Sequence, residues 1–194
     1  MNKKIAEILK DQISSLDWID KIAGLVRPVT FKDKAGNVKT MPIYLNGVDM
    51  CKASAYEDLV PDSSKKSILY FEDGGMDVIN AGCLYIDVLS SLKLVCWCNL
   101  KIINPEYSSA IPMKLEILRT IPTKIDNTDW VTKINVQFAG EDMANPFTPY
   151  TYDEQKQFLI YPYDYFSLNY KVRFSVPLNA ECYDSVELNP DICP

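Results

Sequence analysis

The chain has 194 residues, 47% of them hydrophobic and 24% charged, which is typical of a folded globular protein rather than a disordered one. Its formal charge is −6 and its basic residues are scattered, so the clustered lysines and arginines of a nucleic-acid binder are missing. There is no histidine, which excludes Ser-His-Asp and Cys-His catalysis and histidine zinc sites.

The first apolar stretch is interrupted by Glu7, Lys10 and Asp11, so we expect neither a signal peptide nor a membrane span. The cysteines are then reduced thiols in a cytosolic setting. Cys96 and Cys98 share one face of an expected strand and are interpreted as core residues; Cys51 and Cys83 are too remote to complete a metal site. Near the C-terminus, Cys182 and Cys193 are the one pair considered for a disulfide bond.

An apolar stripe with spacings of three and four predicts an amphipathic helix over residues 3–22, with Asn2 as its cap and Gly24 at its end. Next, β-favouring runs at Val29–Lys32 and Val38–Leu45 flank the charged link Asp33–Asn37. Gly36 and Asn37 tolerate the positive φ of a tight turn, so this segment predicts a projecting hairpin.

Residues 49–66 are polar and indicate a loop, after which three strands are expected at Ser67–Phe71, Leu84–Leu89 and Lys93–Ile103. Gly74-Gly75 and Ser90-Ser91 are interpreted as the turns between them. Links this short favour an antiparallel meander.

A second helix is expected from Ser108 or Ser109 as cap to Pro122, with Pro112 in its first turn. Alternating residues from Trp130 to Phe138 predict a strand with one buried face. A loop over 139–152 and a helical turn over 153–160 precede a final strand from Leu168 to Val176, followed by an irregular tail at about 178–194.

These elements predict an α+β fold: a mostly antiparallel sheet with an N-terminal amphipathic helix, a projecting hairpin, and one or two helices packed on one face. No repeat or linker divides the chain, so residues 1–194 are expected to form a single domain.

No group of residues predicts catalysis, a metal ion or a cofactor. Glu72, Asp73 and Asp77 are interpreted as a solvated acidic turn rather than a calcium site, and Glu141 with Asp142 as plain surface charge. None of the seven glycines forms a P-loop or dinucleotide pattern.

An unusually aromatic segment spans residues 150–170. Tyrosine has a large apolar face and a polar tip, so core edge, subunit interface and carbohydrate platform all remain open, in that order of preference. The aromatic residues concerned are Tyr150, Tyr152, Phe158, Tyr161, Tyr163, Tyr165, Phe166 and Tyr170.

The element order, together with the segment Phe158–Phe166 running into the strand Ser167–Val176, resembles the tail-completion or tail-terminator proteins of tailed bacteriophages, and more loosely other phage neck proteins. The polar insertion between Asp49 and Lys66 and the extension after Pro177 depart from that pattern.

The resemblance implies a virion subunit, made in the host bacterial cytoplasm, that forms a ring at the head-proximal end of the tail. Its partners would be its own copies and tail-tube, neck or connector proteins, and it would carry no catalytic residues. The expectation is therefore not an enzyme, with no direct nucleic-acid or membrane partner.

Two classes of function follow for the surface. An assembling subunit would use the hairpin tip and a charged strand face, whereas a non-catalytic module for glycans or peptides would use the aromatic segment. The interface residues expected from both hypotheses are Lys32, Asp33, Lys34, Asn37, Tyr163, Tyr165, Lys171 and Arg173.

Overall fold

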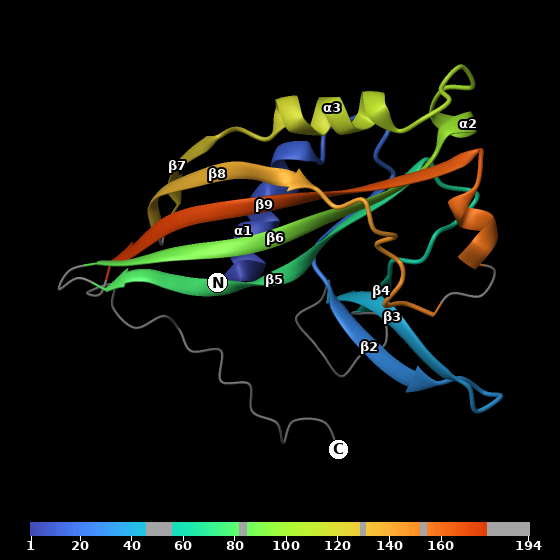
Figure 1. The fold of residues 1–194 in the computed structure, drawn as a ribbon, viewed down its shortest axis with the longest axis horizontal. Helices are drawn as coiled ribbons and strands as arrows, with labels where there is room; N and C mark the ends of the chain where they lie inside the picture. The colour runs from blue at the N-terminus through green and yellow to red at the C-terminus, as the bar shows by residue number, and fades with distance from the viewer. Residues whose placement is uncertain (46–55, 82–84, 129–130, 152–154, 178–194) are drawn as a thin grey trace.

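The computed structural model describes residues 1–45, 56–81, 85–128, 131–151 and 155–177, which form a curled sheet with helices and a smaller sheet beside it (Figure 1). In chain order the elements are α1 (Asn2–Ile13), β1 (Lys21–Leu25), β2 (Arg27–Lys32), β3 (Val38–Leu45), β4 (Tyr56–Asp58), β5 (Ser67–Ala81), β6 (Tyr85–Asn99), α2 (Leu100–Ile103), α3 (Ile111–Thr120), β7 (Lys124–Thr128), β8 (Val131–Glu141), the 3-10 helix η2 (Gln155–Leu159) and β9 (Tyr163–Pro177).

The larger sheet has the strand order β1-β5-β6-β9-β8-β7, and the smaller one has the order β2-β3-β4. Every neighbouring pair is antiparallel except β1 with β5, which is parallel. This mixed α/β arrangement with a mostly antiparallel sheet confirms the predicted α+β class. No described helix has the length and apolar character needed to cross a membrane.

The N-terminal helix is shorter than predicted. Its apolar stripe is confirmed, since Ile5, Leu9 and Ile13 are fully buried, but α1 ends at Ile13 and residues 21–25 form the strand β1. Leu16 and Ile19 continue the predicted spacing and pack against the same cluster, but residues 14–20 form turns, and the backbone of β1 then pairs with β5.

Asn2 does not cap the helix, contrary to the prediction. It lies inside α1, where its Nδ2 donates to Asp73 Oδ1 at 2.7 Å and its Oδ1 accepts from Ser90 Oγ at 2.8 Å. The first turn of α1 is thereby tied to β5 and β6. The Asn2 side chain thus forms hydrogen bonds to distant residues in place of the predicted bond to the backbone of its own helix.

Gly24 lies in β1 rather than at a helix end. The Glu7 carboxylate occupies the place that a Cβ atom would take at this position, so glycine leaves room for the Glu7 side chain of α1 beside β1. The carboxylate of Glu7 also accepts a hydrogen bond from the Tyr44 hydroxyl at 2.8 Å and pairs with Lys10.

The expected three-strand meander is one hairpin of two long strands. β5 and β6 each have 15 residues, so Gly74-Gly75 and Ser90-Ser91 lie within strands and the predicted turns there are wrong. The glycines form a bulge, marked by a register shift between Asp73 and Met76 and a φ of +96° at Gly75. Ser90 is fully buried.

The C-terminal half follows the predictions more closely. α3 is present and has proline in its first turn, but Asp164 Oδ2 accepts the Ala110 N–H at 2.6 Å in place of the expected Ser108 or Ser109 cap. The short strand β7 and the strand β4, which lies within the predicted polar loop, were missed. Trp130 lies outside the described residues, as do Cys51, Cys83, Cys182, Cys193 and the tail.

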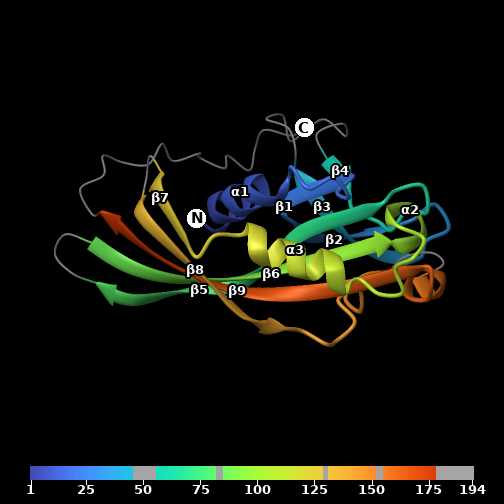
Figure 2. The same cartoon turned by 90° about the horizontal axis from the view of Figure 1, so that it is seen from above.

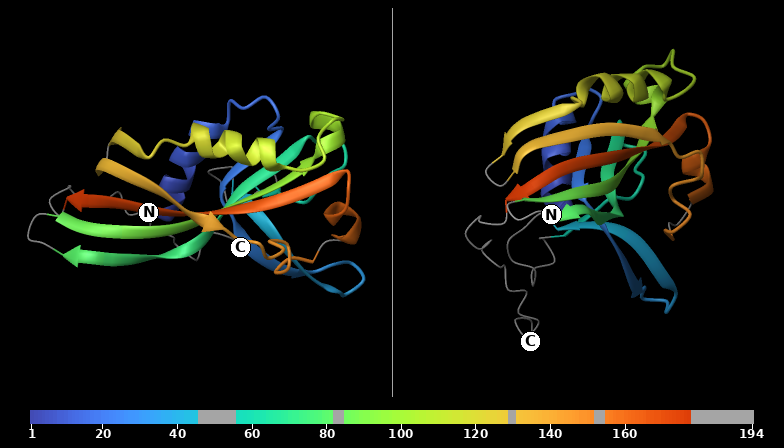
Figure 3. Two further views of the ribbon diagram at one scale, coloured as in Figure 1. Left: turned by 45° about the horizontal axis from the view of Figure 1, so that its top comes forward. Right: turned by 60° about the vertical axis from the view of Figure 1, so that its left-hand side comes forward.

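The first five residues of β5 and the parts of β6 and β9 beside them are covered on both faces. One face packs against α1 and α3 in a cluster that includes Leu94, Leu168 and Phe174, here called the helix-covered cluster. The opposite face carries Ile68, Tyr70, Val95 and Trp97, which pack against Tyr44, Phe147 and Tyr150 in the loop-covered cluster. Figure 2 shows α1 and α3 lying against the long strands, and Figure 3 shows the smaller sheet projecting away from α3.

Candidate functional site

The thiols predicted to be core residues are buried in the helix-covered cluster. Cys96 and Cys98 are both fully buried, and Cys98 Sγ donates to the carbonyl of Asp164 at 3.4 Å. Burial raises the pKa of the Cys96 thiol, so it stays protonated at neutral pH. Among the described residues, no group of three or more His, Cys, Asp or Glu side chains is placed to hold a metal ion.

The acidic residues at 72–77 belong to strand β5, so their interpretation as a turn is wrong. Asp73 Oδ1 accepts hydrogen bonds from Asn2 Nδ2 at 2.7 Å and from the Gly75 N–H at 2.8 Å. Glu72 belongs to a separate polar network on the other face of the sheet.

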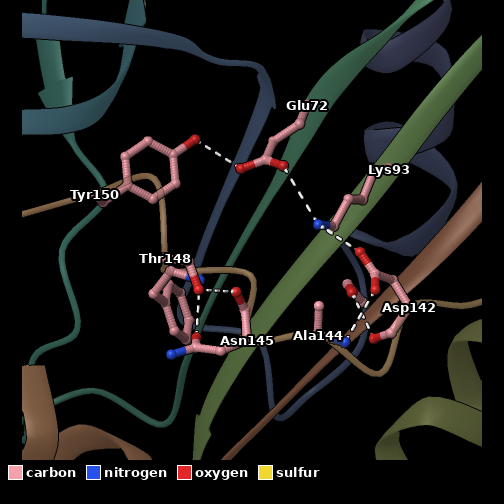
Figure 4. A network of polar contacts seen from close by, with 9 residues as sticks. Glu72, Lys93, Asp142, Ala144, Asn145, Thr148 and Tyr150 are labelled. Atoms are coloured by element: carbon pink, nitrogen blue, oxygen red, sulfur yellow. Dashed lines mark hydrogen bonds and ion pairs between the residues drawn. The ribbon is translucent and has the colours of Figure 1, made fainter.

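This network joins the sheet to the loop after β8 (Figure 4). Lys93 Nζ lies 3.0 Å from Asp142 Oδ2 and 3.8 Å from Glu72 Oε2, and the Tyr150 hydroxyl donates to Glu72 Oε1 at 2.6 Å. Lys93 therefore lies between two carboxylates that come from different segments. Its charge compensates both.

Asp142 is also held by the backbone. The Ala144 N–H donates to its Oδ1 at 3.0 Å, and this bond, together with Lys93, lowers the pKa of Asp142. Further along, the Phe147 N–H donates to Asn145 Oδ1 at 2.9 Å, closing a turn that places Phe147 in the loop-covered cluster. The charged groups of the network and the Tyr150 hydroxyl all have protein partners, so we interpret the network as a clasp that fixes the loop rather than as a reacting centre.

Most of the aromatic segment is packed against the sheet. Trp97 stacks on Tyr163 with ring centroids 5.3 Å apart and meets Phe158 edge-on at 5.8 Å, and Phe147 meets Tyr165 at 5.7 Å. The predicted interface residues Tyr163 and Tyr165 are thus half-buried in the margin of the loop-covered cluster. This matches the first of the three readings, the core edge.

Other members of the segment differ in exposure. Tyr150, Phe166 and Tyr170 are buried, whereas Tyr161 is 65% exposed; Tyr152 lies outside the described residues. A hollow of about 460 Å³ lies beside the segment, lined by Lys21, Val60, Pro61, Asp62, Ser63, Lys65, Ile68 and Phe158.

The predicted hairpin is present and projects from the body of the molecule (Figure 1). We call residues 27–45 the hairpin arm. At its tip, Asp33 Oδ1 accepts hydrogen bonds from the Asn37 N–H at 2.8 Å and the Ala35 N–H at 2.9 Å. These bonds, chiefly those from Asn37, lower the pKa of Asp33. Asp33 and Asn37 therefore hold the turn closed, with the exposed Lys32 and Lys34 beside it.

The hairpin arm exposes apolar side chains as well as charges. Every residue of β2 is exposed, including Val29 at 38% and Phe31 at 40%, and Val38 across the turn is 59% exposed. An exposed β-strand edge with large apolar side chains is a site for pairing with another strand.

A second exposed surface was not predicted. Residues 72–81 of β5 and 85–93 of β6 extend past β1, and we call them the sheet arm. Here Met76 is 47%, Val78 61% and Ile79 48% exposed. The apolar residues Met76, Val78 and Ile79 were the available signal, but the glycines before them were interpreted as a turn.

The remaining predicted interface residues lie on the sheet face opposite the helices. Lys171 and Arg173 alternate with buried residues of β9 as expected, and Arg173 Nη2 lies 3.2 Å from Asp87 Oδ2. The structure does not bring them to the hairpin tip. The tip and the end of the sheet arm lie at opposite ends of the molecule (Figures 1 and 3).

The fold and these surfaces define a mixed α/β protein with two exposed β-arms and a polar network that fastens the loop after β8 to the sheet. No protein-family model matches the chain, and no match is found among curated proteins or among solved structures.

Proposed function

We propose that this protein is a non-catalytic structural subunit that assembles with its own copies into a ring at the tail or neck of a phage particle. The observation that carries the proposal is the pair of arms. Each bears exposed apolar side chains on β-strands, and the two arms differ in sequence and lie at opposite ends of the molecule.

Two different surfaces on one chain favour head-to-tail contacts. If the hairpin arm of one copy meets the sheet arm of the next, the contact is heterologous, and a chain of such contacts closes into a ring when the rotation per subunit permits. Pairing would also cover strand edges that otherwise expose backbone hydrogen-bonding groups.

The placement in a phage tail or neck rests on the resemblance of the segment Phe158–Phe166 and the strand that follows it. Of the expected element order, the N-terminal helix, the β2–β3 hairpin, α3 and the last two long strands are present, whereas the meander is not. It makes tail-tube, neck or connector proteins the further partners, and the virion the site of action. The polar network around Lys93 is consistent with a mechanical role, because its charges are used to fix a loop.

The direct test is the oligomeric state of the full chain. Light scattering over a range of protein concentrations, with negative-stain electron microscopy, should show closed rings of one stoichiometry, either alone or on addition of tail tubes. A chain that stays monomeric at high concentration with tail tubes present contradicts the proposal.

A binding module for a glycan or peptide is the second candidate, favoured by the hollow of about 460 Å³ beside Phe158. Its volume falls in the range of small-molecule sites. Lys65→Ala is the appropriate variant, because Lys65 lines the hollow and is exposed, whereas Tyr163 and Tyr165 contribute to packing. A melting shift with a glycan that is lost in Lys65→Ala without unfolding would favour this candidate; no shift across a glycan panel would reject it.

A further inference from the structure

We infer that the hairpin arm and the sheet arm are the two halves of one interface: β2 of one copy pairs with the open edge of β5 in the next copy. This inference rests on the proposed function and specifies its contact. The occupant of each arm is a second copy of this chain.

The backbone edges available are suitable for such pairing. β1 pairs with β5 only as far as Phe71, and the Val26 N–H donates to the Phe71 carbonyl at 2.8 Å. Beyond Phe71, no strand of the described residues pairs with that edge of β5. β2 likewise pairs only with β3 in the described part of the chain, so both edges can accept a further strand.

The bulges of β5 restrict where a partner strand can sit. Register shifts occur between Asp73 and Met76 and between Val78 and Asn80, and Asn2 Nδ2 already donates to the Gly75 carbonyl at 3.3 Å. The edge after Gly75 is therefore the part left for pairing. It is about as long as β2, which has six residues.

The charges of the two arms are opposite. Residues 27–39 contain four basic side chains and one acidic one, a formal charge of +3, although the whole chain carries −6. The edge at 72–81 contains three acidic side chains and no basic one. Glu72 is paired with Lys93 and Asp73 accepts from Asn2, so Asp77 is the acidic side chain in the part left for pairing. Complementary charge of this kind accelerates association and selects one orientation over others. Two copies of the same arm would repel each other.

The exposed apolar side chains also match in spacing. Val29 and Phe31 are two residues apart on β2, as are Met76 and Val78 on β5, so each pair shares a face of its strand. Pairing of the strands would place aromatic and aliphatic side chains against each other across the interface, where such pairs stabilise sheets.

Single substitutions in each arm provide the test. Phe31→Asp should block the hairpin arm, and Val78→Asp should block the sheet arm, each weakening assembly at least about 10-fold, as expected when an apolar contact residue is replaced by a charge. Both residues are exposed, so circular dichroism should show an unchanged fold. Leu115→Asp is the matched control, because Leu115 is 44% exposed on α3, away from both arms.

Mixing the two blocked variants gives the decisive result. A head-to-tail contact leaves one intact hairpin arm and one intact sheet arm in the mixture, so native mass spectrometry should show a 1:1 dimer and nothing larger. If the wild-type chain forms rings that both variants leave intact, or if each variant alone forms a dimer, the inferred interface is wrong while the proposed function stands. A wild-type chain that never assembles rejects the proposed function itself.

Charge reversal gives an independent check. Lys32→Glu with Lys34→Glu should weaken assembly, and adding Asp77→Lys in the same chain should restore at least part of it. The opposite charges of the two arms attract each other less when salt screens them. Raising the salt concentration from about 0.05 M to 0.5 M should therefore also weaken wild-type assembly. Failure of Asp77→Lys to restore assembly would contradict the pairing of these two arms.

Discussion

Leu94 and Val95 are neighbours on β6, are both fully buried, and belong to different clusters. Leu94 packs in the helix-covered cluster, whose side chains come from helices and strands with regularly spaced apolar residues. Val95 packs under a loop and the smaller sheet, held in place by the clasp around Lys93. The same strand thus supports two kinds of core. The helix-covered cluster is formed by regular helices and strands. The loop-covered cluster depends on the ion pair that holds the loop after β8 against the sheet.

The largest expected effect separates the two clusters directly. Leu94→Ala should lower the free energy of unfolding by about 3 kcal/mol and Val95→Ala by about 2 kcal/mol, since fewer buried methyl groups are lost. Urea unfolding followed by tryptophan fluorescence and circular dichroism measures both. If the clusters form one domain, each variant shifts a single transition; an early separate transition in Val95→Ala would show that the loop-covered cluster unfolds on its own.

Removing the positive charge of Lys93 should destabilise the loop-covered cluster and leave the helix-covered cluster unchanged. Lys93→Met leaves Glu72 and Asp142 without their shared cation and should cost about 1 kcal/mol, a modest amount because the groups are partly exposed. Lys171→Met, on the same sheet face, is the control and should change stability little. Limited proteolysis should detect faster cleavage within residues 142–150 in Lys93→Met alone, and equal cleavage in both variants would argue against the clasp.

Two buried tyrosines should respond in opposite directions to loss of the hydroxyl. The Tyr44 hydroxyl donates to Glu7 Oε1 at 2.8 Å, so Tyr44→Phe should cost about 1 kcal/mol. The Tyr170 hydroxyl is buried and has no hydrogen-bond partner among the described residues, so Tyr170→Phe should raise the stability by about 0.5 kcal/mol. Thermal unfolding measures both, and a loss in Tyr170→Phe would reveal a partner for its hydroxyl.

The smallest effect is the pH dependence of the clasp. The lowered pKa of Asp142 means that the folded state favours the carboxylate, so its stabilisation is complete above the unfolded pKa of about 4 and is lost as the pH falls through the lower folded value. Asp142→Asn should therefore be less stable than the wild type near pH 6, and the difference in stability should narrow as the pH falls below about 4. A gap independent of pH would mean that the charge of Asp142 does not contribute.

The sequence predicts the fold correctly where the apolar residues of an element recur at regular spacing and form a single buried face. The stripe of α1 and the alternation of Leu168 to Val176 were correctly interpreted for this reason. The hairpin at Asp33–Asn37 also followed from local turn chemistry. The helix-covered cluster was therefore largely foreseeable.

The failures occurred where tertiary contacts overrode a local signal. Gly74-Gly75 forms a bulge instead of a turn because β6 continues beside it, with the Ser91 carbonyl oxygen only 3.0 Å from where a Cβ of Gly74 would lie. Asn2 and Ser108 could each cap a helix locally, but Asn2 bonds to Asp73 and Ser90 and the cap of α3 comes from Asp164. The exposed sheet arm was missed for the same reason.

The amino-acid sequence by itself determined the α+β class, the amphipathic helix, the hairpin tip and the periodic strands, because each depends on residues close together in the chain. Only the tertiary structure decided that the acidic residues near Gly74 lie on an open strand edge and that the aromatic segment packs at the core margin. Both properties depend on which segments, distant in the sequence, pack against a given strand. The spacing of residues within the strand does not contain that information.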